Sequence, residues 1–336
     1  MEKTIRLTSS KLILYLILLS SFLLLSIFIA LSTGSVSISF SEILNTLAGN
    51  SSSDFYSEII FKIRLPRIIL ALAVGGGLSV AGAVFQAILM NPLAEPYILG
   101  ISSGGTFGAV LAMVLGISFL GVQLFAFTGA LIVIALVFVI GKRFGELEPN
   151  VMLLTGVMVG AFFSAIILLM INFLNESLRT AIFWLMGNLS LASGDNVYYI
   201  LAISVIVSLF LSLNSQKYNI LSLGDEQASH LGLNTKLVKA ATYVSASLMV
   251  GSIVSVSGII GFVGLIIPHL CRLIFGLDNR IIIPASFFVG SAYLILTDTL
   301  SRNIISPAEV PVGAVTAIIG APIFIYLLRK RFNLIT

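Results

Sequence analysis

Long apolar runs separated by short polar segments dominate the chain. About 20 apolar residues, at a rise of 1.5 Å per residue, span a hydrocarbon core of roughly 30 Å. Runs of this kind predict an all-α polytopic membrane protein of about ten transmembrane helices, at residues 12–32, 66–90, 93–113, 121–140, 151–172, 196–213, 239–257, 259–275, 281–300 and 310–328. The third and eighth runs are short or interrupted by Gly and Pro, so their ends are the least defined.

The second run and the segment after it carry the most specific pattern. Small residues recur there at four-residue spacing, as Gly75 with Ser79 and Gly77 with Ala81. Such spacing lets helix backbones approach closely in lipid. Asn91, Pro92 and Pro96 then interrupt the apolar run, and a broken helix at membrane depth is tolerated only where it is buried in protein or lines a cavity. The pattern predicts a pathway beside a close-packed helix.

Composition supports an integral membrane protein without a soluble domain. The 336 residues are 58% hydrophobic and 10% charged, with a mean hydropathy of +1.12, far above a soluble domain. We therefore expect one helical membrane domain over residues 1–336. The net charge of +4 does not indicate nucleic acid as a partner, because the basic residues lie in short loops and follow a topology rule. One cysteine, Cys271, excludes an intramolecular disulfide, and His269 has no second ligand at metal-binding spacing, so no metal site is expected.

The distribution of basic residues predicts the orientation. With a cytoplasmic N-terminus and an even number of spans, most of the 18 Lys and Arg residues face the cytoplasm. We therefore expect a multi-pass protein of the cytoplasmic (inner) membrane with both termini inside. The basic residues left outside are Lys62, Arg64, Arg67, Arg179 and Arg302.

Two outside segments are long enough for structure of their own. Residues 33–61 predict a loop with a short surface helix. Residues 175–195 contain an apolar stretch around Trp184 that is too short to span, and we expect a helix at the membrane interface, where Trp is favoured. Spans two to five and seven to ten are expected to form an inverted repeat, as in many transporters.

The longest cytoplasmic loop, residues 214–238, predicts a short amphipathic helix. Asp225 and Glu226 would lie in its first turn and Gly232 near its end. The alternative without a functional role is a loop helix that merely rests on the membrane surface. The chain has no GxxxxGK(S/T) motif, so it cannot cradle nucleotide phosphates itself. We expect that it is not an enzyme and that any ATP-driven work comes from a partner.

Two other function classes stay open at this point. Gly100–Gly104 matches G-x-S-x-G and would make an intramembrane serine hydrolase using Ser102 or Ser103. That motif needs a strand–turn–helix context and a histidine within reach, and the chain has only His230 and His269. A passive channel is the other alternative, although a channel would not need the acidic cytoplasmic helix.

Several blocks, in the same order, resemble the FecCD/BtuC family, the permease subunits of type II ABC importers. They are RLPR at residues 64–67, the Gly-rich helix with Gln86, NPLAEPYILG at 91–100, SSG at 102–104, WLMG at 184–187, and the segments 221–233, 258–272 and 309–328. That family takes up iron–siderophore complexes, haem and cobalamin. The resemblance implies a BtuC-like homodimer with its pathway along the two-fold axis, two ABC ATPase subunits that bind ATP and Mg, and an extracytoplasmic substrate-binding protein. It implies no cofactor in this chain.

The resemblance also implies roles for particular residues. The cytoplasmic helix would be the coupling helix that docks into the ATPase, with Leu223, Gly224, Asp225, Glu226, Ala228 and Gly232. Acidic residues of the binding protein would meet Arg64, Arg67 and Arg302. The pathway and its cytoplasmic gate would use Gln86, Asn91, Leu93 and Asn150. From the residues alone, Arg64 and Arg67 could instead anchor to lipid head groups, and Arg302 could form an intrahelical ion pair with Asp298.

The candidate pathway offers few ligands for a bare metal ion. Hard cations need oxygen donors and transition metals favour nitrogen or sulfur, whereas spans two, three, five and eight present mainly Gly, Ser, Asn, Gln and Met, with Glu95 near the break. We expect a metal chelate to move whole, a ferric siderophore first, with haem or cobalamin as alternatives.

Overall fold

The computed structural model describes residues 8–50, 53–143, 146–174, 178–190, 196–305 and 309–332. Its helices are α1 (Ser9–Ser32), α2 (Phe40–Leu47), α3 (Asp54–Glu58), α4 (Leu65–Ile88), α5 (Ile101–Val114), α6 (Phe119–Ile140), α7 (Pro149–Ile171), α8 (Leu178–Leu185), α9 (Asn196–Leu213), α10 (Ser215–Leu221), α11 (Asp225–His230), α12 (Thr235–Ser257), α13 (Val263–Phe275), α14 (Asn279–Asn303) and α15 (Val312–Phe332). Among the described residues the only strands are β1 (Lys142–Arg143) and β2 (Glu146–Leu147), which pair antiparallel.

Ten apolar helices match the ten predicted spans. Seven are long and apolar enough to cross a membrane, and three shorter ones, α5, α13 and α15, occupy the positions of spans three, eight and ten. A π-helical turn, Ile59–Arg64, joins α3 to α4, so that one continuous helix of 35 residues runs from Asp54 to Ile88. The all-α polytopic fold is therefore confirmed, and span two is part of a longer helix than expected.

Spans three and eight begin later than the apolar pattern predicted. The third was expected at 93, but α5 begins at Ile101 after a 3₁₀ turn, Pro96–Leu99. The eighth was expected at 259, but α13 begins at Val263. Backbone conformation explains both corrections, because Met90, Gly100, Gly258 and Phe262 have positive φ angles of 48°, 75°, 66° and 69°, and a right-handed helix cannot continue through them.

Helix α4 lies at the centre of the molecule. Of the residues in the most hydrophobic 18-residue stretch of the helix that contains α4, 89% are buried, against 17% for α1 and 22% for α7. Helix α4 packs against α9, α12, α13 and α14. Glycines permit the close approach: a Cβ on Gly75 would lie 2.3 Å from the carbonyl oxygen of Gly290, and one on Gly82 would lie 1.8 Å from that of Gly264. The predicted packing role of the small residues is thus confirmed against α14, with α13 contacted in the same way.

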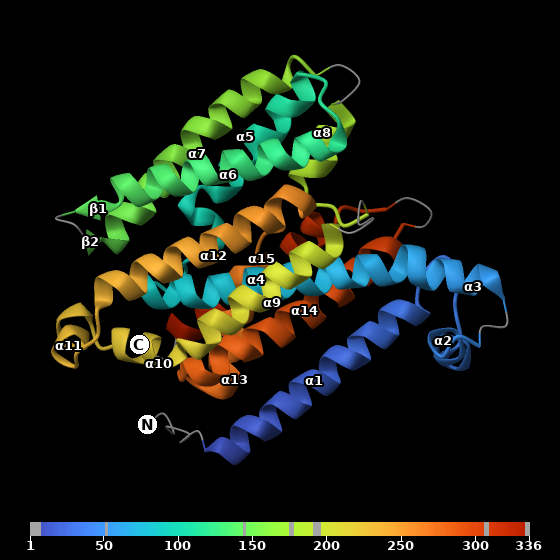
Figure 1. Cartoon of the computed structure of the whole chain (residues 1–336), viewed down its shortest axis with the longest axis horizontal. Coiled ribbons are helices and arrows are strands. Elements are labelled where there is room, and N and C mark those ends of the chain that lie inside the picture. Colours follow the sequence, from blue (N-terminus) through green and yellow to red (C-terminus); the bar gives the residue numbers. More distant parts are fainter. Residues whose placement is uncertain are drawn as a thin grey trace.

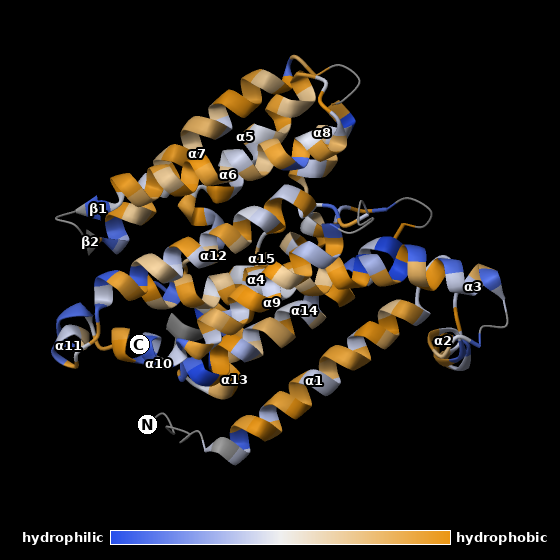
Figure 2. Cartoon of the chain, viewed as in Figure 1, coloured by the Kyte–Doolittle hydropathy of each residue, from blue (hydrophilic) through white to orange (hydrophobic). Residues whose placement is uncertain are grey.

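The peripheral helices present apolar side chains outward. Figure 2 shows α1, α6 and α7 hydrophobic along their lengths, whereas hydrophilic residues gather towards the ends of the molecule. Such a band of exposed apolar side chains is what a surrounding bilayer would solvate.

The start of α1 and the end of α15 lie at the end of the bundle that carries α10 and α11, and α2 and α3 lie at the opposite end (Figure 1). We call these the α11 end and the α3 end. An even number of crossings, as predicted, requires this arrangement.

The helices outside the spans differ in part from the predictions. The segment 33–61 forms two short helices, α2 and α3, where one was expected, and α10 was not expected at all. Helix α8 does form within 175–195, and its place at the membrane interface stays a prediction. Trp184 is buried. Its backbone carbonyl packs against Gly258, where an added Cβ would approach it to 2.1 Å. This contact draws α8 onto the end of α12.

Candidate functional site

The two interrupted helices hold each other through polar contacts. The first interruption, residues 89–100, joins α4 to α5, and the second, residues 258–262, joins α12 to α13. Glu95 Oε1 accepts a hydrogen bond from the backbone N–H of Phe262 at 2.9 Å, and the Tyr97 hydroxyl accepts one from that of Ile260 at 3.3 Å. Each contact satisfies a backbone group that the broken helix leaves without a helical partner, as irregular backbone at membrane depth requires.

Gln86 is fixed between these interruptions. Its Nε2 donates to the carbonyl oxygens of Ala94 at 3.2 Å and Leu265 at 3.4 Å, and its Oε1 accepts a hydrogen bond from the guanidinium of Arg272. Gln86 therefore joins α4, α13 and the first interruption, and is buried while doing so.

A large cavity opens beside Gln86 at the α11 end. It has a volume of about 850 Å³ and lies between α4, α10, α13, α15 and the start of α14; its walls include Gln86, Tyr218, His269, Arg272, Asn279 and Tyr326. The Tyr218 hydroxyl shares a hydrogen bond of 2.9 Å with Thr242. Burial raises the pKa of Tyr218 to about 12, so this hydroxyl stays neutral at physiological pH.

The other predicted gate residues lie on two separate elements. Asn91 Oδ1 accepts a hydrogen bond from the backbone N–H of Leu93 at 2.9 Å, which makes a tight turn at the α11 end. Leu93 is exposed there. Asn150 is exposed in the first turn of α7. The gate role of these residues stays a prediction.

Helix α11 is short but firmly held. It begins after Gly224 and is followed by Gly232, whose φ angles of +102° and +83° favour glycine at both ends. Asp225 Oδ2 lies 2.5 Å from Nζ of Lys239, whose side chain is only 7% exposed. Ala228 is fully buried. The helix is thereby fixed to the start of α12.

Around this anchored helix the leucines face outward. Leu223, Leu231 and Leu237 are 58%, 64% and 65% exposed. We call these three residues the α11 patch. They lie in the predicted cytoplasmic loop and its junction with α12, so the patch is an apolar surface that the bundle itself does not cover.

At the α3 end, Arg67 is the centre of an ion-pair cluster. Its Nε and Nη2 donate to the Asp298 carboxylate at 2.9–3.1 Å, and its Nη1 donates to Glu309 at 2.9 and 3.1 Å. Arg302 Nε lies 3.3 Å from Asp298 Oδ2, which is the intrahelical pair considered above. The cluster ties α4 to α14 and to the segment that enters α15.

Arg64 has a different set of partners. Its guanidinium donates to the backbone carbonyls of Leu31 and Val36 and so holds the end of α1. Arg64 and Arg67 are only 3% and 7% exposed. In this conformation their guanidinium groups serve intramolecular contacts and are not presented to lipid head groups or to another protein, because the partners on α1 and α14 enclose them. Docking through Arg64, Arg67 and Arg302 stays a prediction.

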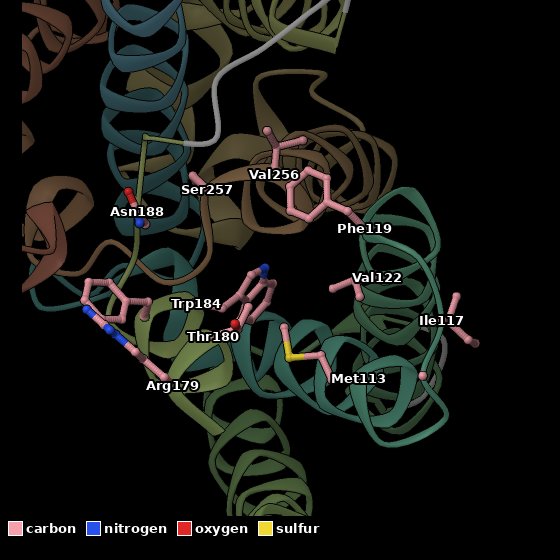
Figure 3. A pocket seen from close by; sticks show the side chains of 12 residues that line it. Met113, Ile117, Phe119, Val122, Arg179, Thr180, Trp184, Asn188, Val256 and Ser257 are labelled. Carbon is pink, nitrogen blue, oxygen red and sulfur yellow. The ribbon is translucent and has the colours of Figure 1, made fainter. Parts of the chain in front are cut away.

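A second cavity, of about 470 Å³, lies between the α5–α6 turn, α8 and the end of α12. Figure 3 shows Met113, Phe119, Val122, Trp184 and Val256 around it. Arg179 stands with its guanidinium carbon 5.6 Å from the centre of the Phe183 ring, a cation–π distance. Arg179, one of the five basic residues that the predicted topology leaves outside, thus has an aromatic partner.

The serine-hydrolase interpretation finds no geometric support. Ser102 and Ser103 lie in the first turn of α5, which follows a 3₁₀ turn and not a strand. The nucleophile elbow needs a strand–turn–helix context. His230 ends α11, and His269 lies on α13 beside the large cavity, with its ring 6.3 Å from that of Phe324.

Sequence reasoning missed three residues that organise these sites: Lys239, Arg272 and Glu309. Arg272 and Glu309 have partners 186 and 242 residues away, and Lys239 meets Asp225 across 14 residues, so no helical repeat reveals these contacts. The available signal was the presence of Lys239 and Arg272 within or beside apolar spans, where ionisable side chains are rare and have specific roles.

Comparison with known proteins places this arrangement in a family. The sequence profile of the FecCD transport family matches residues 22–330. The cobalamin import system permease protein BtuC of Halobacterium salinarum is 40% identical over 274 residues, covering 81% of this chain and 74% of that protein. The molybdate import system permease protein MolB of Haemophilus influenzae is 34% identical over 322 residues, covering 93% and 94%.

A solved structure agrees in fold as well as in sequence. It is described as an inward-facing conformation of an ABC transporter of proposed metal-chelate type. The two sequences are 33% identical, and the match covers 94% of this chain and 99% of the solved chain, with a TM-score of 0.85. These findings confirm the resemblance seen in the sequence. The chain therefore belongs to the FecCD transport family and is a permease subunit, not the ATPase, of an ABC importer.

Proposed function

We propose that two copies of this chain, with two ABC ATPase subunits and an extracytoplasmic binding protein, import a metal chelate across the inner membrane, with both termini and α11 in the cytoplasm. The observation that carries the proposal is the α11 patch. Three exposed leucines at the α11 end flank α11, the short helix that Asp225 and Lys239 fix to the bundle. A rigid apolar surface outside the bilayer is suited to a protein partner.

The same observation separates the importer from a passive channel. A channel has no need of a rigidly anchored docking helix, whereas an importer must receive the motion of its ATPase at a fixed point. Because α11 is joined to α12 through Lys239, and α12 packs against α4, a displacement of α11 reaches the central helix through direct contacts.

For the substrate we propose a ferric siderophore first, with haem, cobalamin and, from the range of relatives, molybdate as alternatives. The interruptions beside α4 present amide, hydroxyl and backbone groups that are already paired, as with Gln86 and Tyr97. Such walls suit a bulky, fully coordinated complex better than a bare cation, which needs several free donor atoms. The metal-chelate type proposed for the solved relative supports the same class.

The test is uptake into proteoliposomes that hold the permease and its ATPase, with the cognate binding protein and ATP. Labelled ferric siderophore, haem, cobalamin, molybdate and free iron are compared. We expect ATP-dependent uptake of one chelate and no uptake of free iron. Preference for free iron would overturn the chelate proposal, and uptake that needs no ATPase would overturn the importer.

A further inference from the structure

Helix α2, at the α3 end, has an apolar side and a polar side. It begins after Ser39, whose hydroxyl accepts a hydrogen bond from the backbone N–H of Glu42 at 3.3 Å. Phe40, Leu44 and Leu47 recur at helical spacing and therefore share one side of the helix. We call these three residues the α2 face. At about 100° per residue, Glu42 lies on the opposite side.

The bundle does not cover the α2 face. Ile43 belongs to the apolar core, and Ile43 and Thr46 are 0% and 2% exposed, so this side of α2 lies against the protein. Phe40, Leu44 and Leu47 are 62%, 43% and 46% exposed. At about 100° per residue, the attached side and the α2 face are roughly a quarter of a turn apart. The helix therefore rests on the protein with one side and offers an apolar face to its surroundings.

Helix α2 runs across the direction of the spans. In Figure 1, α1 and α4 are seen lengthwise, whereas α2 is seen end-on near the end of α1. The guanidinium of Arg64 donates to the carbonyl oxygens of Leu31 and Val36 and so holds the link between α1 and α2. A helix that crosses the spans at the level where α1 ends runs along the membrane surface. Amphipathic helices at a lipid interface have this orientation.

An aromatic contact shows which way the α2 face is turned. The centres of the Phe40 and Phe28 rings are 5.3 Å apart, and Phe28 lies a full turn inside the end of α1 at Ser32. Leu25 and Ile29 beside it are 57% and 40% exposed and belong to the apolar surface that a bilayer would solvate. The α2 face therefore continues the outer surface of α1 and is turned towards the membrane interior.

The charge of the segment favours lipid over the proposed binding protein as the occupant of this face. Residues 33–53 contain no Lys or Arg, and their one acidic residue is Glu42. A binding protein that presents acidic residues would find no basic side chain here, whereas lipid chains need only the apolar residues. We propose that α2 is an interfacial helix whose face, Phe40, Leu44 and Leu47, inserts among the lipid chains of the leaflet at the α3 end.

Such an insertion would set the depth of the whole molecule in the bilayer. Arg64 directly precedes α4 and holds the link between α1 and α2. The α2 face is thereby connected to the central helix through one buried side chain. This proposal does not depend on the substrate, and its test needs neither transport nor the ATPase.

The test is quenching of tryptophan fluorescence at known depths. The full-length permease is placed in nanodiscs of phosphatidylcholine that carries bromine either near the head-group end of its acyl chains or near their far end, and iodide is the quencher in water. The chain has one tryptophan, the buried Trp184, whose emission in the wild-type protein is subtracted.

Four variants each place one new probe at an exposed position. Leu44→Trp and Leu47→Trp lie on the α2 face, and Asn45→Trp, on the polar side of the same helix, is the matched control. Leu18→Trp, near the middle of α1 and 57% exposed, is the reference for the bilayer interior.

We expect the emission of Leu44→Trp and Leu47→Trp to lie at shorter wavelength than that of Asn45→Trp, to be quenched by bromine near the head groups and to be protected from iodide. Asn45→Trp should show the reverse, and Leu18→Trp should be quenched most by the deeper bromine. Quenching of both face variants by iodide as strong as that of Asn45→Trp, with none by bromine, would overturn the proposal. Protection from iodide that arises only when the binding protein is added would assign the face to that protein and overturn it as well.

Discussion

Arg67 on α4 and Asp298 on α14, 231 residues apart in the chain, form a bidentate ion pair in which three N–H···O distances lie between 2.9 and 3.1 Å. Both side chains are almost completely buried. The pair lies where α4 and α14 share their most extensive helix contact. It therefore fixes the α3 end of the central helix pair.

Removing one member of this pair should destabilise the protein strongly. Arg67→Ala would leave Asp298 buried with only Arg302 nearby, and breaking a buried pair typically costs about 3–5 kcal/mol. We expect a clear fall in the unfolding temperature in detergent. Lys62→Ala, which removes an exposed pair with Glu58 on the adjoining helix turns, should leave it nearly unchanged. Equal effects of the two substitutions would contradict the structural role of Arg67.

Close packing of α4 on α13 predicts a sharp difference between two glycines. Gly82→Ala would place a Cβ 1.8 Å from the backbone oxygen of Gly264, whereas the nearest contact for Gly160→Ala is 3.4 Å, to the Ser103 hydroxyl. Overpacking typically costs about 1–3 kcal/mol. We therefore expect Gly82→Ala to lower stability and membrane yield, and Gly160→Ala to behave as wild type. A wild-type unfolding temperature for Gly82→Ala would rule out the described helix contact.

The α11 patch predicts a separation between folding and partner binding. Leu231→Glu adds a charge to an exposed residue, so the isolated permease should keep its unfolding temperature while a co-expressed ATPase no longer co-purifies. Lys217→Ala, an exposed change on α10, is the control and should retain the ATPase. Normal co-purification with Leu231→Glu would show that the patch is not the docking surface.

Asp225 is unsuitable for the same test because it pairs with the buried Lys239. Asp225→Lys would place two positive charges together, so we expect it to reduce stability as well as coupling. Comparing its unfolding temperature with that of Leu231→Glu checks this. A stable Asp225→Lys variant would mean that the pair does not anchor α11.

The cluster at the α3 end refines the docking prediction. Glu309 is half exposed and shares Arg67 with Asp298, so it adds a negative charge where an acidic partner would approach. Because charges at a rim change association rates, Glu309→Gln should speed binding of the proposed binding protein at low salt, and Arg302→Gln should slow it. Stopped-flow or surface-binding kinetics would measure both. Glu58 is an exposed acidic residue at the same end, so Glu58→Gln is the control for a change in net charge alone. Equal association rates for all three variants would refute docking at this cluster.

The sequence by itself determined the number of spans, the breaks after α4 and α12, the close-packed face of α4 and the short helix at 225–230. These features depend on local patterns: apolar length, small residues at four-residue spacing, and prolines and glycines that end helices. They are encoded within a few turns of chain, so they can be inferred without tertiary contacts.

Only the tertiary structure decided where the charged and amide side chains point. Arg67 meets Asp298 across 231 residues, Arg272 meets Gln86 across 186, and Phe262 meets Glu95 across 167. No periodicity relates residues so far apart, so Arg64 and Arg67 were expected at an exposed surface although both are buried. A long polar side chain in an apolar protein must find a partner, and which partner it reaches depends on how the helices pack.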